Sequence, residues 1–250
     1  MKKIISIVAI FSFIFSSIAP AFAADAVWNG TTDAVWATGT NWSATPVPGT
    51  GNTATFNNAG GAIDIIDISG GIAIKSIVFD TGAVSYTIGD GLHADTLALD
   101  NLGVIQMTAG VLNDQTFNAN ITLGGAGAFQ NYSSTNTLTF NGTVNSASGT
   151  EDLTLTAGTG NMVFAGAVGT TNSLEDLKIV SVKNLTTAAI TAETITQDGG
   201  TGATTFNGAV NTSAAGGVNI VNETIAVNSG ITTTGNGIVT LNADTATLTI

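Results

Sequence analysis

Two pairs of carboxylates are the residues of this chain whose type and spacing most suggest chemistry. Asp64 and Asp67 lie close together in the sequence, and so do Asp90 and Asp95. Paired carboxylates several ångströms apart catalyse the hydrolysis of glycosidic bonds. Asp64 and Asp67, however, have opposite parity in an alternating run, so they would face opposite sides of a strand. We interpret them as solvated strand residues.

His93 is the single histidine, and it lies in a Gly-Asp loop between Asp90 and Asp95. A metal role is one hypothesis for it, but a lone histidine in such a loop is more often exposed polar surface. The loop also suggests calcium, yet the chain lacks the tandem G-G-x-G-x-D nonapeptides of calcium-binding β-rolls. We therefore predict no metal site and no bound cofactor.

The remaining titratable residues form no stronger pattern. Lys75 stands alone in a strand-like run, and the paired acids Glu151-Asp152 and Glu175-Asp176 are most simply turn and surface charges. Serine is abundant but histidine is single, so no Ser-His-Asp set is distinguishable. The sequence therefore predicts a protein that is not an enzyme and has no catalytic residue.

Composition narrows the class of protein further. The 250 residues include 17 Asp and Glu against 5 Lys and no Arg, which gives a formal net charge of −12. A nucleic-acid partner is excluded, because it requires a basic face that neutralises phosphates. The absence of cysteine excludes disulfides and thiolate zinc sites. With 44% apolar residues and 31 glycines, the chain favours an all-β extracellular protein.

The N-terminal segment 1–23 has the pattern of a cleaved signal peptide. Lys2 and Lys3 form a positive start, residues 4–18 are apolar, and Ala21-Phe22-Ala23 is a small-x-small cleavage pattern after Pro20. The apolar run of about 15 residues is shorter than the roughly 20 that a membrane-spanning helix needs. We therefore expect an exported protein, cleaved after Ala23, whose mature region does not span the membrane.

The mature region predicts short β-strands. Apolar and polar residues alternate with period 2 in runs such as 63–68, 153–156 and 245–250, and Gly, Asn and Asp separate these runs. The best candidate for a helix is Ser173–Leu185, but its second half also alternates. We therefore predict strand there as well.

An aromatic-x-Gly-x-Val unit recurs at Phe140, Phe164 and Phe206. Phe56, Phe79 and Phe117 extend the series backwards, with Phe79 to Phe117 interpreted as two short units. Leu185 starts a degenerate copy, and Val227 follows one unit after Phe206. The repeat is roughly 18–24 residues, which is too short to bury its own apolar face, so neighbouring units must stack.

Stacking of such units predicts a parallel β-helix with the Phe and Val side chains inside. About nine coils, each about 4.8 Å thick, would form a rod roughly 40–45 Å long. Glycine would sit where a Cβ would clash, and Asn would hydrogen-bond to neighbouring coils. An antiparallel sandwich or propeller is the competing fold, because the Asn-Gly pairs 29–30, 141–142 and 207–208 are typical of hairpin turns.

All three tryptophans fall in residues 28–42, in the string Trp28-x-Gly30, Trp36 and Asn41-Trp42, and a Pro- and Gly-containing segment and Phe56 follow. One interpretation is carbohydrate stacking or contact with a host surface. The other is an N-terminal cap that covers the first coil. We favour the cap. The expected organisation is a signal peptide over 1–23, a Trp-rich cap region over 24–56 and solenoid repeats over 57–250.

The tryptophan string and the later F-x-G-x-V units resemble the passenger domains of bacterial autotransporters and related exported adhesins with β-strand repeats. This resemblance implies a right-handed parallel β-helix displayed at the surface of a Gram-negative-type cell, at the outer membrane or outside it. A complete autotransporter would also carry a membrane β-barrel. The chain stops within the strand-like run 245–250, so we expect a portion of a longer protein, or an end that another subunit covers.

The predicted function is a stiff, non-catalytic display rod or adhesin. Its expected partner is a host or neighbouring-cell surface or a glycan, with self-association through the open solenoid end as a further possibility. Two alternatives stay open. One is a secreted carbohydrate-active β-helix enzyme, and the other is a surface-layer or matrix subunit that assembles through open strand edges.

Overall fold

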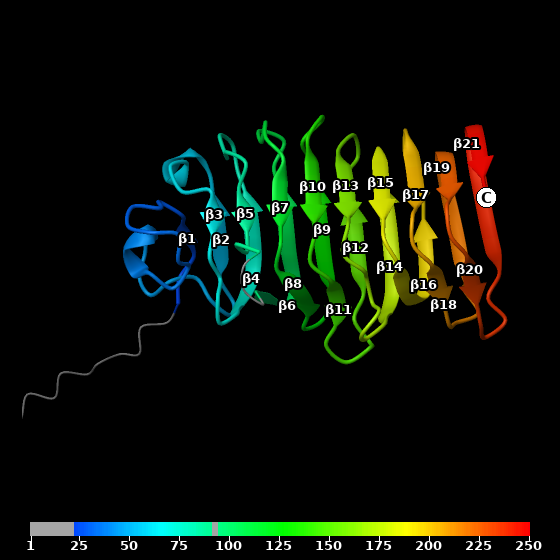
Figure 1. Ribbon diagram of the computed structural model, residues 1–250, viewed down its shortest axis with the longest axis horizontal. Helices are drawn as coiled ribbons and strands as arrows, with labels where there is room; N and C mark the ends of the chain where they lie inside the picture. The colour runs from blue at the N-terminus through cyan, green and yellow to red at the C-terminus, as the bar shows by residue number, and fades with distance from the viewer. Residues whose placement is uncertain (1–22, 92–94) are drawn as a thin grey trace, which may run out of the picture.

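The computed structural model describes residues 23–91 and 95–250. The predicted signal peptide, apart from Ala23, and His93 lie outside these residues. The described chain is an all-β solenoid of about eight turns, with 21 strands in one continuous sheet (Figure 1). All pairings between its named strands are parallel, so the sandwich and propeller alternatives do not hold. Its described residues include no helix long and apolar enough to cross a membrane.

Three sheet faces, here called A, B and C, surround the core, and each coil visits C, then A, then B. Face A is made of β2 (Thr53–Phe56), the second halves of β4 (Ile72–Phe79) and β6 (Thr96–Met107), β9 (Gly127–Asn131), β12 (Leu153–Thr156), β14 (Leu174–Ser181), the second half of β16 (Ile190–Gln197), and the first halves of β19 (Val218–Val227) and β21 (Val239–Thr249).

Face B is made of β3 (Ile65–Ile66), β5 (Thr87–Ile88), β7 (Gln115–Phe117), β10 (Thr137–Phe140), β13 (Asn161–Phe164), β15 (Asn184–Thr187), β17 (Ala203–Phe206), and the second halves of β19 and β21. Face C is made of the first halves of β4, β6 and β16 with β8 (Asn120–Leu123), β11 (Val144–Ser146), β18 (Val210–Thr212) and β20 (Ile231–Thr233). Two short 3-10 helices, η1 (Gly39–Asn41) and η2 (Asn58–Gly60), and β1 (Ala26–Val27) lie at the N-terminal end.

The core is built from columns of equivalent inward side chains. On face B, Phe117 pairs in register with Phe140, and Phe140 with Phe164. These rings are buried and stacked, with centroids 5.3 and 4.9 Å apart. Stacked rings add about 0.5–1.5 kcal/mol each beyond the area they bury. The aromatic repeat in the sequence is therefore one column of the solenoid core.

Two details of the predicted repeat are wrong. Phe79 lies on face A, where it pairs with Phe56 and Met107, whereas Phe117 lies on face B, so the interval between Phe79 and Phe117 does not span two coils. The face-B position after Phe164 is Thr187, because Leu185 pairs with Met162 one position earlier in the inward alternation.

The length of a coil also varies more than the repeat in the sequence predicts. Ile179 pairs with Gln197 across a short coil, whereas Ile77 pairs with Ile105 across a coil that is longer than the predicted range. Val227 does follow Phe206 in register, as predicted. Segment 173–185 is also extended, as β14 and the start of β15.

The glycine of the F-x-G-x-V unit marks the corner between faces B and C. A Cβ at Gly142 would lie 2.1 Å from the carbonyl oxygen of Ala119, and one at Gly166 would lie 2.0 Å from that of Gly142. The neighbouring coil approaches so closely that no other residue fits. Outside the corner, the Asn141 side chain donates to the Asn118 side-chain oxygen at 2.8 Å, which joins neighbouring coils as expected.

Thr187 is a defect in the face-B column. Its side chain is buried, and its hydroxyl finds no hydrogen-bond partner among the described residues. We predict that Thr187→Val, which keeps the shape and removes the unpaired hydroxyl, increases the free energy of unfolding by about 1 kcal/mol. Thermal unfolding measures it. Thr186→Val, at the neighbouring outward position, is the matched control and should change stability little. An unchanged or lower melting temperature for Thr187→Val would contradict the prediction.

Candidate functional site

The N-terminal end of the solenoid is closed by its three tryptophans. Trp28, Trp36 and Trp42 are at most 4% exposed. Trp42 contacts Trp28 and Trp36 edge-on, with ring centroids 5.1 and 4.6 Å away, and packs on Phe56 of the first coil at 5.8 Å. Rings buried on both sides offer no face on which a sugar could stack.

Hydrogen bonds fix this cap as firmly as packing does. The Trp28 indole donates to the carbonyl oxygen of Ile63 at 3.1 Å, and the Trp42 indole donates to that of Trp36 at 2.7 Å. The buried Asn41 amide donates to Asp33 at 2.8 Å and to the carbonyl oxygen of Val35 at 3.0 Å. These indole and amide donors are therefore used within the cap.

Asp64 and Asp67 flank the short strand β3. Asp64 is exposed, and Asp67, which is half-buried, accepts from the backbone N–H of Ser69 at 2.7 Å. The backbone of Asp67 forms a bridge with Val35 of the cap. The expected alternation does not reach either residue, because β3 contains only Ile65 and Ile66. Asp67 serves to join the cap to the first coil.

Asp90 and Asp95 do lie together. The Asp90 backbone N–H donates to the Asp95 carboxylate at 2.9 Å, and the other oxygen of Asp95 finds no partner among the described residues. Burial is the main cause that raises the pKa of Asp95, and the negative charges of Asp90 and Asp67 raise it further. His93, the proposed third member, lies outside the described residues.

The Lys75 side chain forms a hydrogen bond within the fold. Its ammonium group donates to the backbone carbonyl of Asn101 at 2.8 Å. Asn101 lies in the corner at residues 100–103, where β6 turns from face C to face A and Leu102 takes a left-handed φ of 58°. Lys75 therefore stabilises the corner at residues 100–103 of the neighbouring coil.

Glu151 is the polar residue whose role sequence reasoning missed, because it is buried and not a surface charge. It accepts hydrogen bonds from the hydroxyls of Ser146 and Ser148 and from the backbone N–H groups of Ser148, Gly149 and Thr150. Burial opposes its ionisation, but these donors outweigh burial and lower its pKa to about 2. The serines in the run Ser146-x-Ser148-Gly149-x-Glu151 were the sequence signal from which this buried role of Glu151 could have been predicted. Asp152, Glu175 and Asp176 are exposed, as expected.

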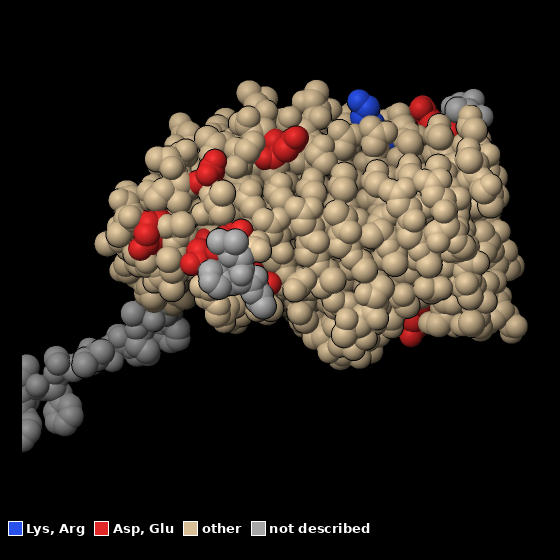
Figure 2. All heavy atoms as spheres, viewed as in Figure 1, with Lys and Arg blue, Asp and Glu red and all other residues tan. Residues whose placement is uncertain are grey.

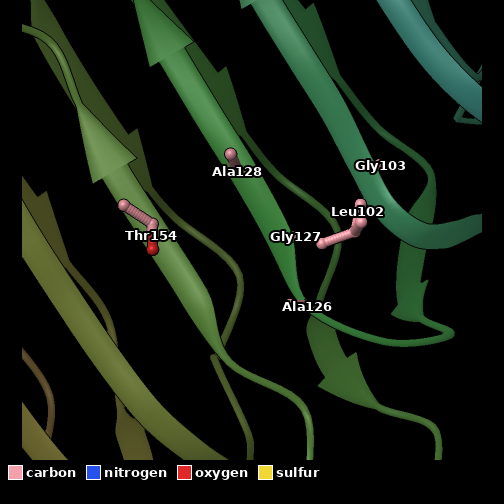
Figure 3. Close-up of a pocket in the computed structure, with 6 residues that line it drawn as sticks. All are labelled: Leu102, Gly103, Ala126, Gly127, Ala128 and Thr154. Atoms are coloured by element: carbon pink, nitrogen blue, oxygen red, sulfur yellow. The ribbon is translucent and has the colours of Figure 1, made fainter.

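A shallow hollow lies on face A, between β6, β9 and β12 (Figure 3). Its lining is apolar or small, with Leu102 and Ala128 beside two glycines and Thr154. Its volume of about 210 Å³ is below the roughly 300–1,000 Å³ of small-molecule sites. It has no titratable lining residue, and the described residues contain no group of three His, Asp or Glu side chains placed to hold a metal ion.

Comparison with known protein families, with curated proteins and with solved structures found no match.

Glu151 should make the stability of the protein depend on pH in the acidic range. Because its pKa falls from 4.5 to about 2 on folding, the stability it provides is complete above pH 4.5 and is lost as the pH falls towards 2. We predict that Glu151→Gln lowers the free energy of unfolding by about 1–3 kcal/mol at pH 7. Urea unfolding at several pH values measures this, with the exposed Glu175→Gln as control. The difference should shrink below pH 4.5. A loss independent of pH would contradict the charge-based explanation.

Asp95 should have the opposite effect. A raised pKa means that folding favours the protonated carboxyl group, so its stabilisation is present at low pH and is lost as the pH rises through the folded-state pKa. We predict that Asp95→Asn raises the melting temperature at pH 7, because Asn still accepts from the Asp90 N–H but carries no buried charge. At pH 3 the variant and the native protein should melt together. A lower melting temperature at pH 7 would contradict the prediction, because it would show that the charged carboxylate stabilises the fold.

Proposed function

We propose that this chain is an exported, non-catalytic rod that displays its outer faces at the cell surface, as an adhesin-like protein. The observation that carries the proposal is that polar side chains which could have done chemistry form hydrogen bonds within the fold instead. Asp67 joins cap to coil, Lys75 holds a corner, and Glu151 organises a turn. These residues are occupied in maintaining the stack, which leaves the outer faces of the strands as the surface for contact.

Two further observations support a display role. Parallel ladders join the described coils without a break from β2 to β21, so the rod is stiff. The resemblance of the tryptophan string and the F-x-G-x-V units to autotransporter passengers supports export to the surface of a Gram-negative-type cell. The excess of acids over lysines, 17 against 5 in the whole chain, keeps such a rod soluble and away from anionic lipids.

Surface labelling tests this proposal directly. An antibody raised against residues 24–250 should label intact source cells, and its antigen should be in the outer membrane or culture supernatant. Labelling should not require permeabilisation, and an antibody to a cytoplasmic protein is the control for leakage. Antigen found only in the cytoplasmic fraction would overturn the proposal. Release of reducing sugar from polysaccharides, abolished by Asp90→Asn or Asp95→Asn, would favour the carbohydrate-active enzyme.

One observation favours the alternative of an assembling subunit. In the last coil the inward positions Val239 and Leu248 are 42% and 43% exposed, although Val218 and Ile225, their partners one coil earlier, are buried. The outer edge of β21 pairs with no other described strand, and such an edge can pair with another strand. If this edge drives assembly, the protein should form larger species with rising concentration in sedimentation experiments. Leu248→Lys should prevent it, and Leu112→Lys, at an exposed site on an earlier coil, should not. A concentration-independent monomer would exclude this role.

A further inference from the structure

Face B presents two columns of outward side chains along the rod. Its strands lie side by side along the long axis (Figure 1). Threonine is the most frequent residue in both columns, accompanied by small or uncharged residues. The first column holds Ile65, Thr87, Thr116, Thr139, Val163, Thr186, Thr205, Ala226 and Thr249. The second holds Thr137, Asn161, Asn184, Ala203, Thr224 and Thr247.

The segments of face B that pair from coil to coil carry no charged residue, although the chain has 17 acids. Charged residues stand beside these segments instead: Asp64, Asp114 and Lys183 come just before β3, β7 and β15, and Glu223 lies within β19, just before its face-B half. In the view of Figure 2, acidic side chains gather over the N-terminal part of the rod, whereas a broad surface over its C-terminal part shows charged atoms only near its edges. A ligand that fits this face is therefore uncharged.

The other two faces are less regular. The outward column of face A contains Lys178, which pairs with Asp198 at 3.3 Å. Face C is interrupted in its middle, where Val168 joins its neighbours only by isolated bridges. Face B alone is both uncharged and built of strands in each consecutive coil from β3 to β21 within the described residues.

The threonine hydroxyls of face B are free and held in place. Those of Thr116, Thr139, Thr186 and Thr205 hydrogen-bond to no other described residue, and all four side chains are half-buried. Branching at Cβ restricts each side chain to few rotamers. Backbone pairing on both sides fixes the strand beneath it. The hydroxyl and methyl groups are thus ordered before any ligand arrives, which lowers the entropic cost of binding.

Spacing limits the ligand to a regular surface. Neighbouring coils are about 4.8 Å apart, and alternate residues along a strand are about 6.6 Å apart, so the side chains form a rectangular grid. A ligand that matches many points of this grid must itself repeat on that scale in two directions. Such a ligand is the surface of a crystal, either ice or a neutral crystalline polysaccharide.

Aromatic side chains decide between these two crystals. Flat sugar-binding surfaces use exposed rings, which stack on the apolar faces of sugars. The aromatic residues in the described strands of face B, including Phe117 and Phe140, all point inward and are buried. Threonine methyl groups and free hydroxyls can contact ordered water. Unlike charged groups, they do not hold a tight hydration shell of their own, so face B favours ice.

We propose that face B binds ice, through ordered water held on its outward columns, in which threonine predominates. This inference rests on the fold and not on the proposed cell-surface role, because purified protein would show it wherever the cell places the chain. In a cell that does export the rod, the same face would attach that cell to ice.

Ice-affinity partitioning of the purified chain tests the proposal. The protein should be enriched in a slowly grown ice fraction and should inhibit ice recrystallisation, whereas serum albumin should remain in the liquid. Thr139→Lys and Thr186→Lys, which place charges in the middle of face B, should each abolish enrichment. Thr156→Lys, the same change at an outward position of face A, should retain it. Circular dichroism and thermal unfolding verify that each variant is folded. If a lysine variant unfolds, the smaller change Thr205→Asp at the same face replaces it.

Three results would overturn the proposal. The first is native protein that partitions like albumin. The second is loss of enrichment in Thr156→Lys equal to that in the face-B variants, which would show that any added charge suffices. The third is binding to crystalline cellulose or chitin without binding to ice, which would assign face B to a polysaccharide. The labelling of intact cells tests the cell-surface role separately, so the two proposals fail independently.

Discussion

A coil of about twenty residues cannot bury its own apolar side chains, and this constraint determines the rest of the structure. Each coil of this chain must present its inner side chains to an identical position one coil away, in parallel register. Phe117, Phe140 and Phe164 show the result, because each covers the next within a continuous column. The same register makes outward side chains repeat, so order inside the rod produces order on its surface.

Stacking leaves an end without a neighbour, and the N-terminal end shows how this chain solves that problem. A regular coil there would expose Phe56 and an open strand edge. Irregular backbone, with Trp28 and Trp42 packed over Phe56, replaces the missing coil. Irregular backbone needs its own hydrogen bonds, and Asn41 and Asp33 supply them from side chains. Asn41 and Asp33 therefore have a structural role in the cap.

The architecture was predictable from the sequence because equivalent positions in successive coils carry similar residues. The F-x-G-x-V unit identified both an inward column and the corner glycine, since a steric requirement at Gly142 recurs at Gly166. The sequence could not show that Phe79 and Phe117 lie on different faces. Both faces use phenylalanine, and corners such as residues 100–103 change the coil length without changing the core pattern.

Individual polar roles were less predictable than the fold. Glu151 depends on three backbone N–H groups that converge only after the turn has formed, so its neighbours in sequence hardly distinguish it from a surface acid. The parity argument for Asp64 and Asp67 assumed a long strand, whereas β3 ends after Ile66. Alternation of residues along the sequence predicts which way side chains point only where the residues stay paired in a β-ladder.

The distribution of charge links this architecture to contact with other surfaces. Inside a stack, equivalent positions are about 4.8 Å apart, so like charges repeated along a column would repel each other along the whole rod. Selection for a stable stack therefore favours uncharged outward columns and moves acids to corners, where they are farther apart and hydrated. Threonine satisfies this requirement and has high strand propensity. The requirements of folding thus leave the paired segments of face B uncharged and ordered, so contact through this face needs no dedicated binding residue.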